Sequence, residues 1–222
     1  ADLATQGGPV VGELQVDQRL PGEAGGQRGA DVVGVANQLV GQGVGGERLV
    51  MGLELRIGFR GPALFPGHRV ALVVAAQHAF FKAAGAPCIV YGETARSVQG
   101  IKSAPLATKP KLTEAETAAY GRKISDFADW CAKQGMPISY HHHMAAAIET
   151  EAELDLFMKH SSVPLLFDAG HMACAGGDNL RVIENHWKRI THVHTKDIRR
   201  PVVDALDRSK ESFLDAVVKG AF

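Results

Sequence analysis

Short β-rich runs alternate with helical segments at a regular spacing, and this alternation constrains the fold of the 222-residue chain most. Strand-like runs begin near residues 87, 136, 163 and 190, and a helical segment follows each of them. The last three runs begin 27 residues apart. A strand, a helix and the next strand at such a repeat form right-handed βαβ units, which build a parallel sheet. The chain is therefore predicted to be an α/β protein.

Capping signals indicate where two of the helices begin. Thr113 and Glu116 form a capping box, in which each side chain satisfies a backbone amide at the start of a helix. Thr150 and Glu153 repeat the same pattern before the next helical segment. We expect helices to follow both pairs.

Flavodoxin-like open sheets and (β/α) barrels share this alternation, so the spacing alone does not distinguish them. The polar residues favour a barrel, because they gather at the C-terminal end of each run, where a barrel assembles its active site. These residues are Tyr91 and Glu93, His141 to His143, Asp168 and His171, and His192, His194 and Asp197. The predicted fold is an incomplete (β/α) TIM barrel.

Three of these strand ends predict a metal site. Side chains alternate between faces along a strand, so His141 and His143 should project together while His142 points away. Asp168 ends the following run and His194 the one after. Any one of them is more commonly a structural residue, such as a hydrogen-bonded histidine or a turn-capping aspartate. Together they offer the imidazole and carboxylate ligands that suit Zn²⁺, Mn²⁺ or Co²⁺.

The first part of the chain has a different composition. Residues 1–81 contain no Lys, Ser, Tyr, Trp or Cys and hold 16 of the 25 glycines. Frequent glycine disfavours the interiors of helices and strands alike. A flexible extension explains this composition, but we favour a segment that is not the natural N-terminus, translated in a wrong reading frame or from the opposite strand. We therefore predict an atypical Gly-rich segment over 1–79, not native barrel sequence and without regular βα pairs, and a partial TIM-barrel domain over 80–222.

The charge balance limits the classes of binding partner, and the cysteine content indicates the cellular compartment. Lys and Arg together number 24, as do Asp and Glu, which argues against a nucleic-acid or membrane-surface partner. Three scattered cysteines fit reduced thiols in the cytoplasm better than a disulfide framework. No apolar run approaches the roughly 20 residues of a membrane span. We expect a cytoplasmic protein.

Four motifs carry a resemblance to a known family: VYGE (90–93), SYHHHM (139–144), LLFDAGHMACAGGD (165–178) and HVHTKDIR (192–199). Through them, the segment from about Phe80 to Phe222 resembles the xylose-isomerase-like barrels, a superfamily of sugar isomerases, epimerases and endonuclease IV. Within it, the segment is most similar to the inosose dehydratases of myo-inositol catabolism. The resemblance implies a hydro-lyase that removes water from 2-keto-myo-inositol (scyllo-inosose) through an enediolate.

The resemblance also implies roles for single residues. The metal ligands would be His141, Asp168 and His194, the proton-transfer residues His143 and His171, and the substrate-binding residues Glu93, His192 and Arg199. The implied ion is Mn²⁺ or Co²⁺, with Zn²⁺ as a further option, and glutathione is associated with the family. The implied substrate is a small polyol ketone, and a homo-oligomer is compatible with the resemblance. The glutamate that the family carries on a later strand has no counterpart before Phe222.

Three alternatives remain open at this point. A ketose epimerase or isomerase of the same superfamily would use the same metal and the same enediolate. An endonuclease-IV-like enzyme would need more ligands and a basic groove, which the balanced charge disfavours. The third alternative is an inactive truncated fragment. The metal content of the protein distinguishes this last alternative from the others, and substrate assays distinguish the enzymes.

Overall fold

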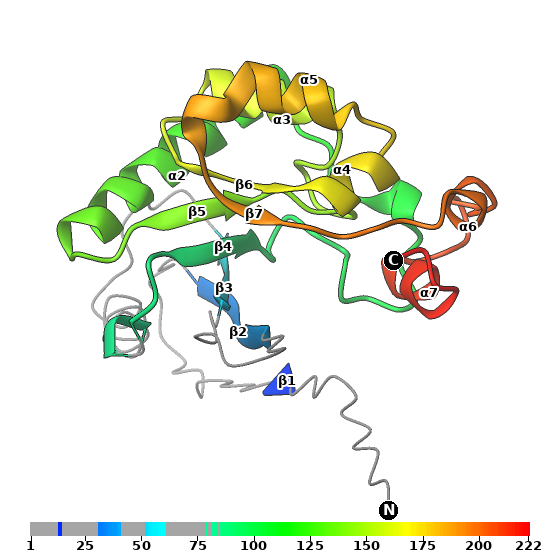
Figure 1. Ribbon diagram of the computed structural model, residues 1–222, viewed down its shortest axis with the longest axis horizontal. Helices are drawn as coiled ribbons and strands as arrows, with labels where there is room; N and C mark the ends of the chain where they lie inside the picture. The colour runs from blue at the N-terminus through cyan, green and yellow to red at the C-terminus, as the bar shows by residue number, and fades with distance from the viewer. Residues whose placement is uncertain (1–12, 15–30, 41–51, 61–78, 80, 84) are drawn as a thin grey trace, which may run out of the picture.

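The computed structural model describes residues 13–14, 31–40, 52–60, 79, 81–83 and 85–222 (Figure 1). The described strands form one sheet in the order of the chain. They are β1 (Glu13–Leu14), β2 (Asp31–Val40), β3 (Gly52–Arg60), β4 (Ile89–Glu93), β5 (Ile138–His141), β6 (Leu165–Asp168) and β7 (Ile190–His194). The α-helices are α2 (Glu114–Lys133), α3 (Glu151–Lys159), α4 (Ala169–Cys174), α5 (Asn179–His186), α6 (Arg200–Asp204) and α7 (Phe213–Val218). Short 3-10 helices span Leu106–Thr108 and Trp187–Arg189.

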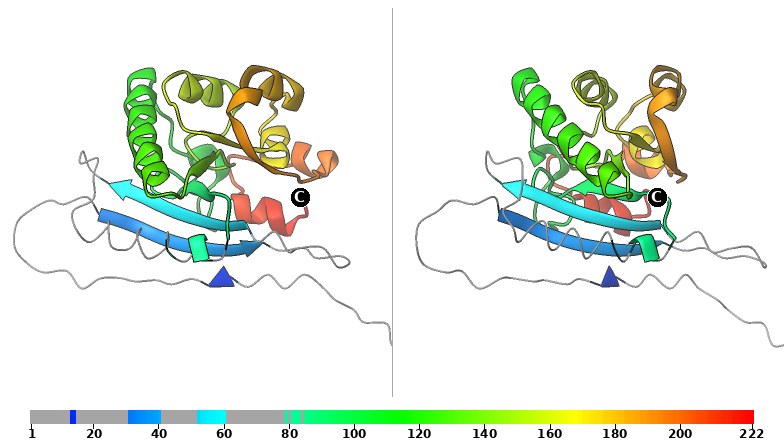
Figure 2. Two further views of the ribbon diagram at one scale, coloured as in Figure 1. Left: turned by 60° about the vertical axis from the view of Figure 1, so that its left-hand side comes forward. Right: turned by 90° about the vertical axis from the view of Figure 1, so that its left-hand side faces the viewer.

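The four strands from β4 to β7 are parallel and adjacent in chain order, as predicted. Helices α2, α3 and α5 all cover the same face of these strands (Figures 1 and 2). A doubly wound open sheet would reverse its strand order and carry helices on both faces. Sequential order with one covered face is the arrangement of consecutive units in a (β/α) barrel. The predicted fold class is confirmed for this part of the chain.

Both predicted capping boxes are present. The Thr113 side chain accepts the N–H of Glu116, whose carboxylate accepts the N–H of Thr113 in return. Thr150 and Glu153 make the same reciprocal pair at the start of α3. Because these signals are local in sequence, the starts of both helices lie where the sequence indicates.

The main hydrophobic core fills the space between the helices and strands β4 to β6. Its largest members are aromatic, and the rings of Tyr140 and Phe157 lie 4.4 Å apart. Tyr91 stacks on Tyr140 with ring centroids 5.8 Å apart. No helix among the described residues is both long enough and apolar enough to cross a bilayer.

The segment before Phe80 contributes more regular structure than its composition predicted. Strand β3 is parallel to β4 and extends the sheet. Strand β2 is antiparallel to β3, and β1 to β2, so the segment adds one parallel strand beside β4 and not two. The stretch GLELRIGFR (52–60) alternates apolar residues with polar residues or glycine, which is typical of a strand. The rest of 1–79 lies outside the described residues, and its origin stays a prediction.

The C-terminal segment lies beyond the ends of the parallel strands, where Figure 1 shows α6 and α7. Backbone hydrogen bonds fasten it to the loop that follows β4. The N–H of Leu106 donates to the carbonyl of Glu211 at 2.7 Å, and the N–H of Ala107 to that of Arg208 at 2.7 Å. This segment therefore covers the rim at which the predicted site residues were expected.

Candidate metal centre

Four titratable side chains meet at the C-terminal ends of three neighbouring strands. His141 ends β5, Asp168 ends β6 and His194 ends β7. His171 lies in the first turn of α4, which follows β6 directly. Asp168 and His194 are partners in the parallel register of β6 and β7, so these two strands end side by side. The structure thus brings together the three predicted ligands and His171, as the sequence predicted.

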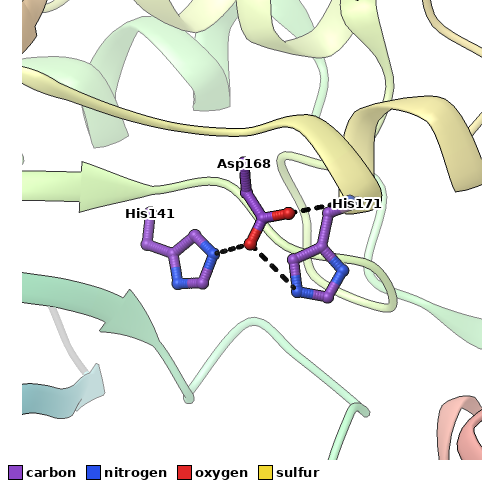
Figure 3. Close-up of side chains that lie close together, drawn as sticks. All are labelled: His141, Asp168 and His171. Carbon is purple, nitrogen blue, oxygen red and sulfur yellow. Dashed lines mark hydrogen bonds and ion pairs between the residues drawn. The ribbon is translucent and has the colours of Figure 1, made fainter. Parts of the chain in front are cut away.

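One oxygen, Oδ2 of Asp168, lies at the centre of this cluster. It is 3.2 Å from Nε2 of His141, 3.4 Å from Nδ1 of His194 and 3.8 Å from Nε2 of His171. Figure 3 shows His141 and His171 on either side of the carboxylate. His141, Asp168 and His171 are buried, and each offers a ligand atom within 4.8 Å of the other two. This buried group contains His171, whereas the predicted ligand His194 is partly exposed and contacts the carboxylate from outside the group.

Asp168 is fully buried and yet ionised. Burial alone would raise its pKa, but hydrogen bonds from His141 and His194 and the positive charge of Lys196 hold the pKa far below its ordinary value. Its other oxygen, Oδ1, accepts the backbone N–H of His171 at 2.9 Å. The carboxylate is therefore oriented by the helix that it caps.

Lys196 belongs to this cluster and was missed in the sequence. Its ammonium donates to Oδ2 of Asp168 and lies 3.0 Å from Nε2 of His171. The motif HVHTKD contains the signal, since Lys196 follows His194 by two residues and an extended chain returns to the same face with that period. The sequence interpretation used the histidines and Asp197 of this motif and passed over the lysine.

The other two histidines of the run 141–143 have different environments. His142 is fully buried on the far side, where its Nε2 accepts the backbone N–H of Asp168 at 3.2 Å. Burial lowers the pKa of His142 to about 3, so this ring is neutral. The ring of His143 lies 3.7 Å from that of His171, centroid to centroid. As predicted, alternate residues face the cluster and His142 does not.

His171 is a neutral, buried imidazole beside His143. Burial lowers its pKa well below the ordinary value, and the neighbouring His143 and Lys196 lower it further. Its Nδ1 is buried and has no hydrogen-bond partner among the described residues. Phe213 and Phe222 of the C-terminal segment lie beside it, with ring centroids at 5.7 Å and 5.4 Å. A small polar molecule bound here could form a hydrogen bond with Nδ1 of His171 and would contact the apolar rings of Phe213 and Phe222.

The three predicted substrate-binding residues are dispersed. His192 lies on β7, and its ring centroid is 5.5 Å from that of His194. The carboxylate of Glu93 accepts the Tyr120 hydroxyl at 2.9 Å, and burial raises its pKa. The guanidinium of Arg199 donates to the carbonyl of Gly220 at 2.8 Å. Glu93 also accepts the backbone N–H groups of Ala95 and Arg96, at 2.7 Å and 3.2 Å. Its contacts are therefore with the aromatic core and the turn after β4, and those of Arg199 are with the C-terminal segment.

Comparison with known proteins gives sequence relatives but no matching family model. The chain is 41% identical over 140 residues to the rhizopine catabolism protein MocC of Rhizobium meliloti, covering 62% of this chain and 43% of that protein. It is 38% identical over 161 residues to the inosose dehydratase of Geobacillus thermodenitrificans, covering 71% of this chain and 54% of that protein. The chain spans about half the length of the curated relatives it matches.

A solved structure with a similar backbone is that of the IOLI protein with a bound zinc atom. The TM-score is 0.46 at 13% sequence identity, and the match covers 74% of this chain and 60% of that one. The sequence relatives confirm the resemblance that the four motifs indicated.

Proposed function

We propose, from the relation of this chain to the inosose dehydratases, that the cluster around Asp168 serves a hydro-lyase acting on 2-keto-myo-inositol (scyllo-inosose). One observation carries the proposal: imidazole and carboxylate groups converge at neighbouring strand ends in a chain related in sequence to that family. The substrate class is a small polyol ketone. A cytoplasmic location and the absence of nucleic-acid and membrane partners stay predictions from composition.

The donor set fits a divalent ion. In this proposal His141, Asp168 and His194 hold Mn²⁺ or Co²⁺, or alternatively Zn²⁺, with His171 beside them. An ionised carboxylate and neutral imidazoles are the protonation states that ligation requires, and the low pKa of Asp168 supports the first of these. When bound, such an ion would polarise the ketone and stabilise the negative charge that develops on its oxygen.

Proton transfer is assigned to His171 and His143. Dehydration breaks a C–H bond beside the carbonyl and a C–O bond at the next carbon, and the hydroxyl leaves as water after receiving one proton. A neutral imidazole can accept the first proton. Burial keeps His171 neutral, and an imidazole that has received a proton can donate it to the departing hydroxyl. Nδ1 of His143 is 2.7 Å from the carbonyl of Met144, a contact that orients the ring.

Substrate hydroxyls are assigned to Glu93, His192 and Arg199. His192 lies beside His194, which supports a role for His192 in substrate binding. For Glu93 and Arg199 the support is the family resemblance, and glutathione enters the proposal on the same ground alone.

A ketose epimerase or isomerase is the second candidate. Both reactions begin with loss of the proton beside a carbonyl, so the same cluster would serve either. The third candidate is an inactive fragment. The experiment tests for it because the chain covers about half of each relative.

The experiment incubates the protein with Mn²⁺, Co²⁺ or Zn²⁺ and either scyllo-inosose or a hexulose. Mass spectrometry follows the loss of one water from inosose, and NMR follows epimerisation of the hexulose. We expect dehydration of inosose with added metal, and no dehydration by Asp168→Asn. Epimerisation of the hexulose alone would favour the second candidate. Metal binding without turnover of either substrate would indicate the inactive fragment.

A further inference from the structure

Lys196 occupies a position that the proposed metal ion would also need. Its ammonium contacts the central oxygen of the cluster, Oδ2 of Asp168, and is 3.0 Å from Nε2 of His171. Asp168 is a ligand in the proposed metal site and His171 lies beside that site, and both belong to the compact group formed with His141. The lysine therefore provides the positive charge that the buried carboxylate requires.

The position of Lys196 is built into the fold. A Cβ atom added to Gly170 would lie 2.5 Å from Cβ of Lys196, so only a glycine in α4 lets the backbone of Lys196 approach this closely. The Lys196 side chain is not fully enclosed, since it is 34% exposed while that of Asp168 is 0% exposed. A fixed base and a partly exposed, flexible side chain allow the ammonium to move away from Asp168.

We propose that Lys196 is an internal competitor for the metal, whose ammonium and a divalent ion exclude each other at Asp168. The inference rests on the metal site of the proposed function. The Lys196 ammonium and the divalent ion both bind the same carboxylate oxygen of Asp168. At contact distance in a poorly solvated site, these two cations repel each other. Loading the ion therefore requires Lys196 to leave Asp168, and the lost ion pair weakens metal affinity. Without the lysine charge the site should bind metal more tightly.

The test compares Mn²⁺ affinity in the wild type, Lys196→Met and Lys196→Arg by isothermal titration at one fixed pH. Loss of a charge-assisted hydrogen bond from the competitor should tighten binding by about 10- to 100-fold in Lys196→Met. Lys196→Arg keeps the positive charge and should bind no more tightly than the wild type. Lys188→Met is the matched control, because Lys188 lies over Trp187 and should leave affinity unchanged.

Circular dichroism verifies folding, and Lys196→Gln is the second neutral variant if Lys196→Met does not fold. If the wild type binds Mn²⁺ and the neutral variant binds it equally or more weakly, Lys196 does not compete with the metal. The proposed metal site would be unaffected by that result. If neither the wild type nor a folded neutral variant binds Mn²⁺, Co²⁺ or Zn²⁺, the proposed metal site fails and the competition falls with it.

Discussion

Two neighbouring buried groups, Asp168 and His142, have their charges decided by their partners. Asp168 is buried among imidazoles and an ammonium, which hold its pKa down and keep it charged. His142 contacts the backbone N–H of Asp168, and burial dominates, so its pKa falls to about 3 and the ring is neutral. Burial disfavours charge in both cases, and only the aspartate has charged neighbours strong enough to reverse it.

His142→Gln should flatten the dependence of stability on pH between about pH 3 and 6.5. In that window an unfolded histidine binds a proton whereas the buried one does not, so the unfolded state holds more protons. Wild-type stability therefore falls as pH falls, with one group contributing about 1.4 kcal/mol per pH unit. Urea unfolding of both proteins across this range measures the slopes.

The matched control for that series is His186→Gln, which changes a histidine paired with Asp155 outside the cluster. This change should leave the contribution of His142 to the pH dependence of stability unchanged. Identical slopes for wild type and His142→Gln would mean that His142 is not held neutral in the folded protein.

At the scale of elements, Gly121 determines how closely α2 and α3 approach. A Cβ at this position would lie 2.6 Å from the carbonyl oxygen of His160, which caps the C-terminus of α3. Gly121→Ala gains about 1 kcal/mol of helix propensity. The clash with rigid backbone should outweigh that gain and give a net loss of about 1–3 kcal/mol.

Urea unfolding at one pH measures this change, and the exposed position Ala115→Gly calibrates the propensity of the same helix. Ala115→Gly, at the second helical position, should cost less than the roughly 1 kcal/mol of a helix interior. A Gly121→Ala protein more stable than the wild type would show that α2 and α3 are not in close contact at Gly121.

The elements that were predictable from sequence carry their own local signals. The capping boxes at Thr113 and Thr150 lie within four residues, and the ends of β5 to β7 follow apolar runs. Strand β3 was missed because the frequent glycines of 1–79 were taken to disfavour strands, although the apolar residues of 52–60 alternate regularly. The contact of Glu93 with Tyr120 was not predictable, because it joins residues 27 apart on a strand and a helix. The position of Lys196 was predictable, because it follows His194 by two residues and an extended chain returns to the same face with that period, but it was overlooked.

At the scale of the whole molecule, the C-terminal segment is tied to the loop that carries His143. Arg208 pairs with the buried carboxylate of Glu149, which also accepts the N–H of Ala145 at 2.7 Å. Ala145 has a φ of 64°, a left-handed conformation that is costly for a residue with a Cβ. The pair therefore stabilises a strained turn next to His143.

Arg208→Met should destabilise the protein by about 1–3 kcal/mol, because it leaves the Glu149 carboxylate buried without its cation. This value is discounted from that of a fully buried pair, since the Arg208 side chain is 40% exposed. Glu149→Gln combined with Arg208→Met should cost less than the sum of the two single changes. Urea unfolding of all four proteins measures the coupling, and strictly additive losses would contradict the pairing.

Metal stoichiometry determines whether one divalent ion binds at Asp168. Protein equilibrated with Co²⁺ and dialysed is analysed by mass spectrometry of the metal, alongside Asp168→Asn and the control His186→Gln. We expect one Co²⁺ per chain in the wild type and in His186→Gln, and none in Asp168→Asn. An Asp168→Asn protein that keeps one Co²⁺ per chain would contradict this expectation.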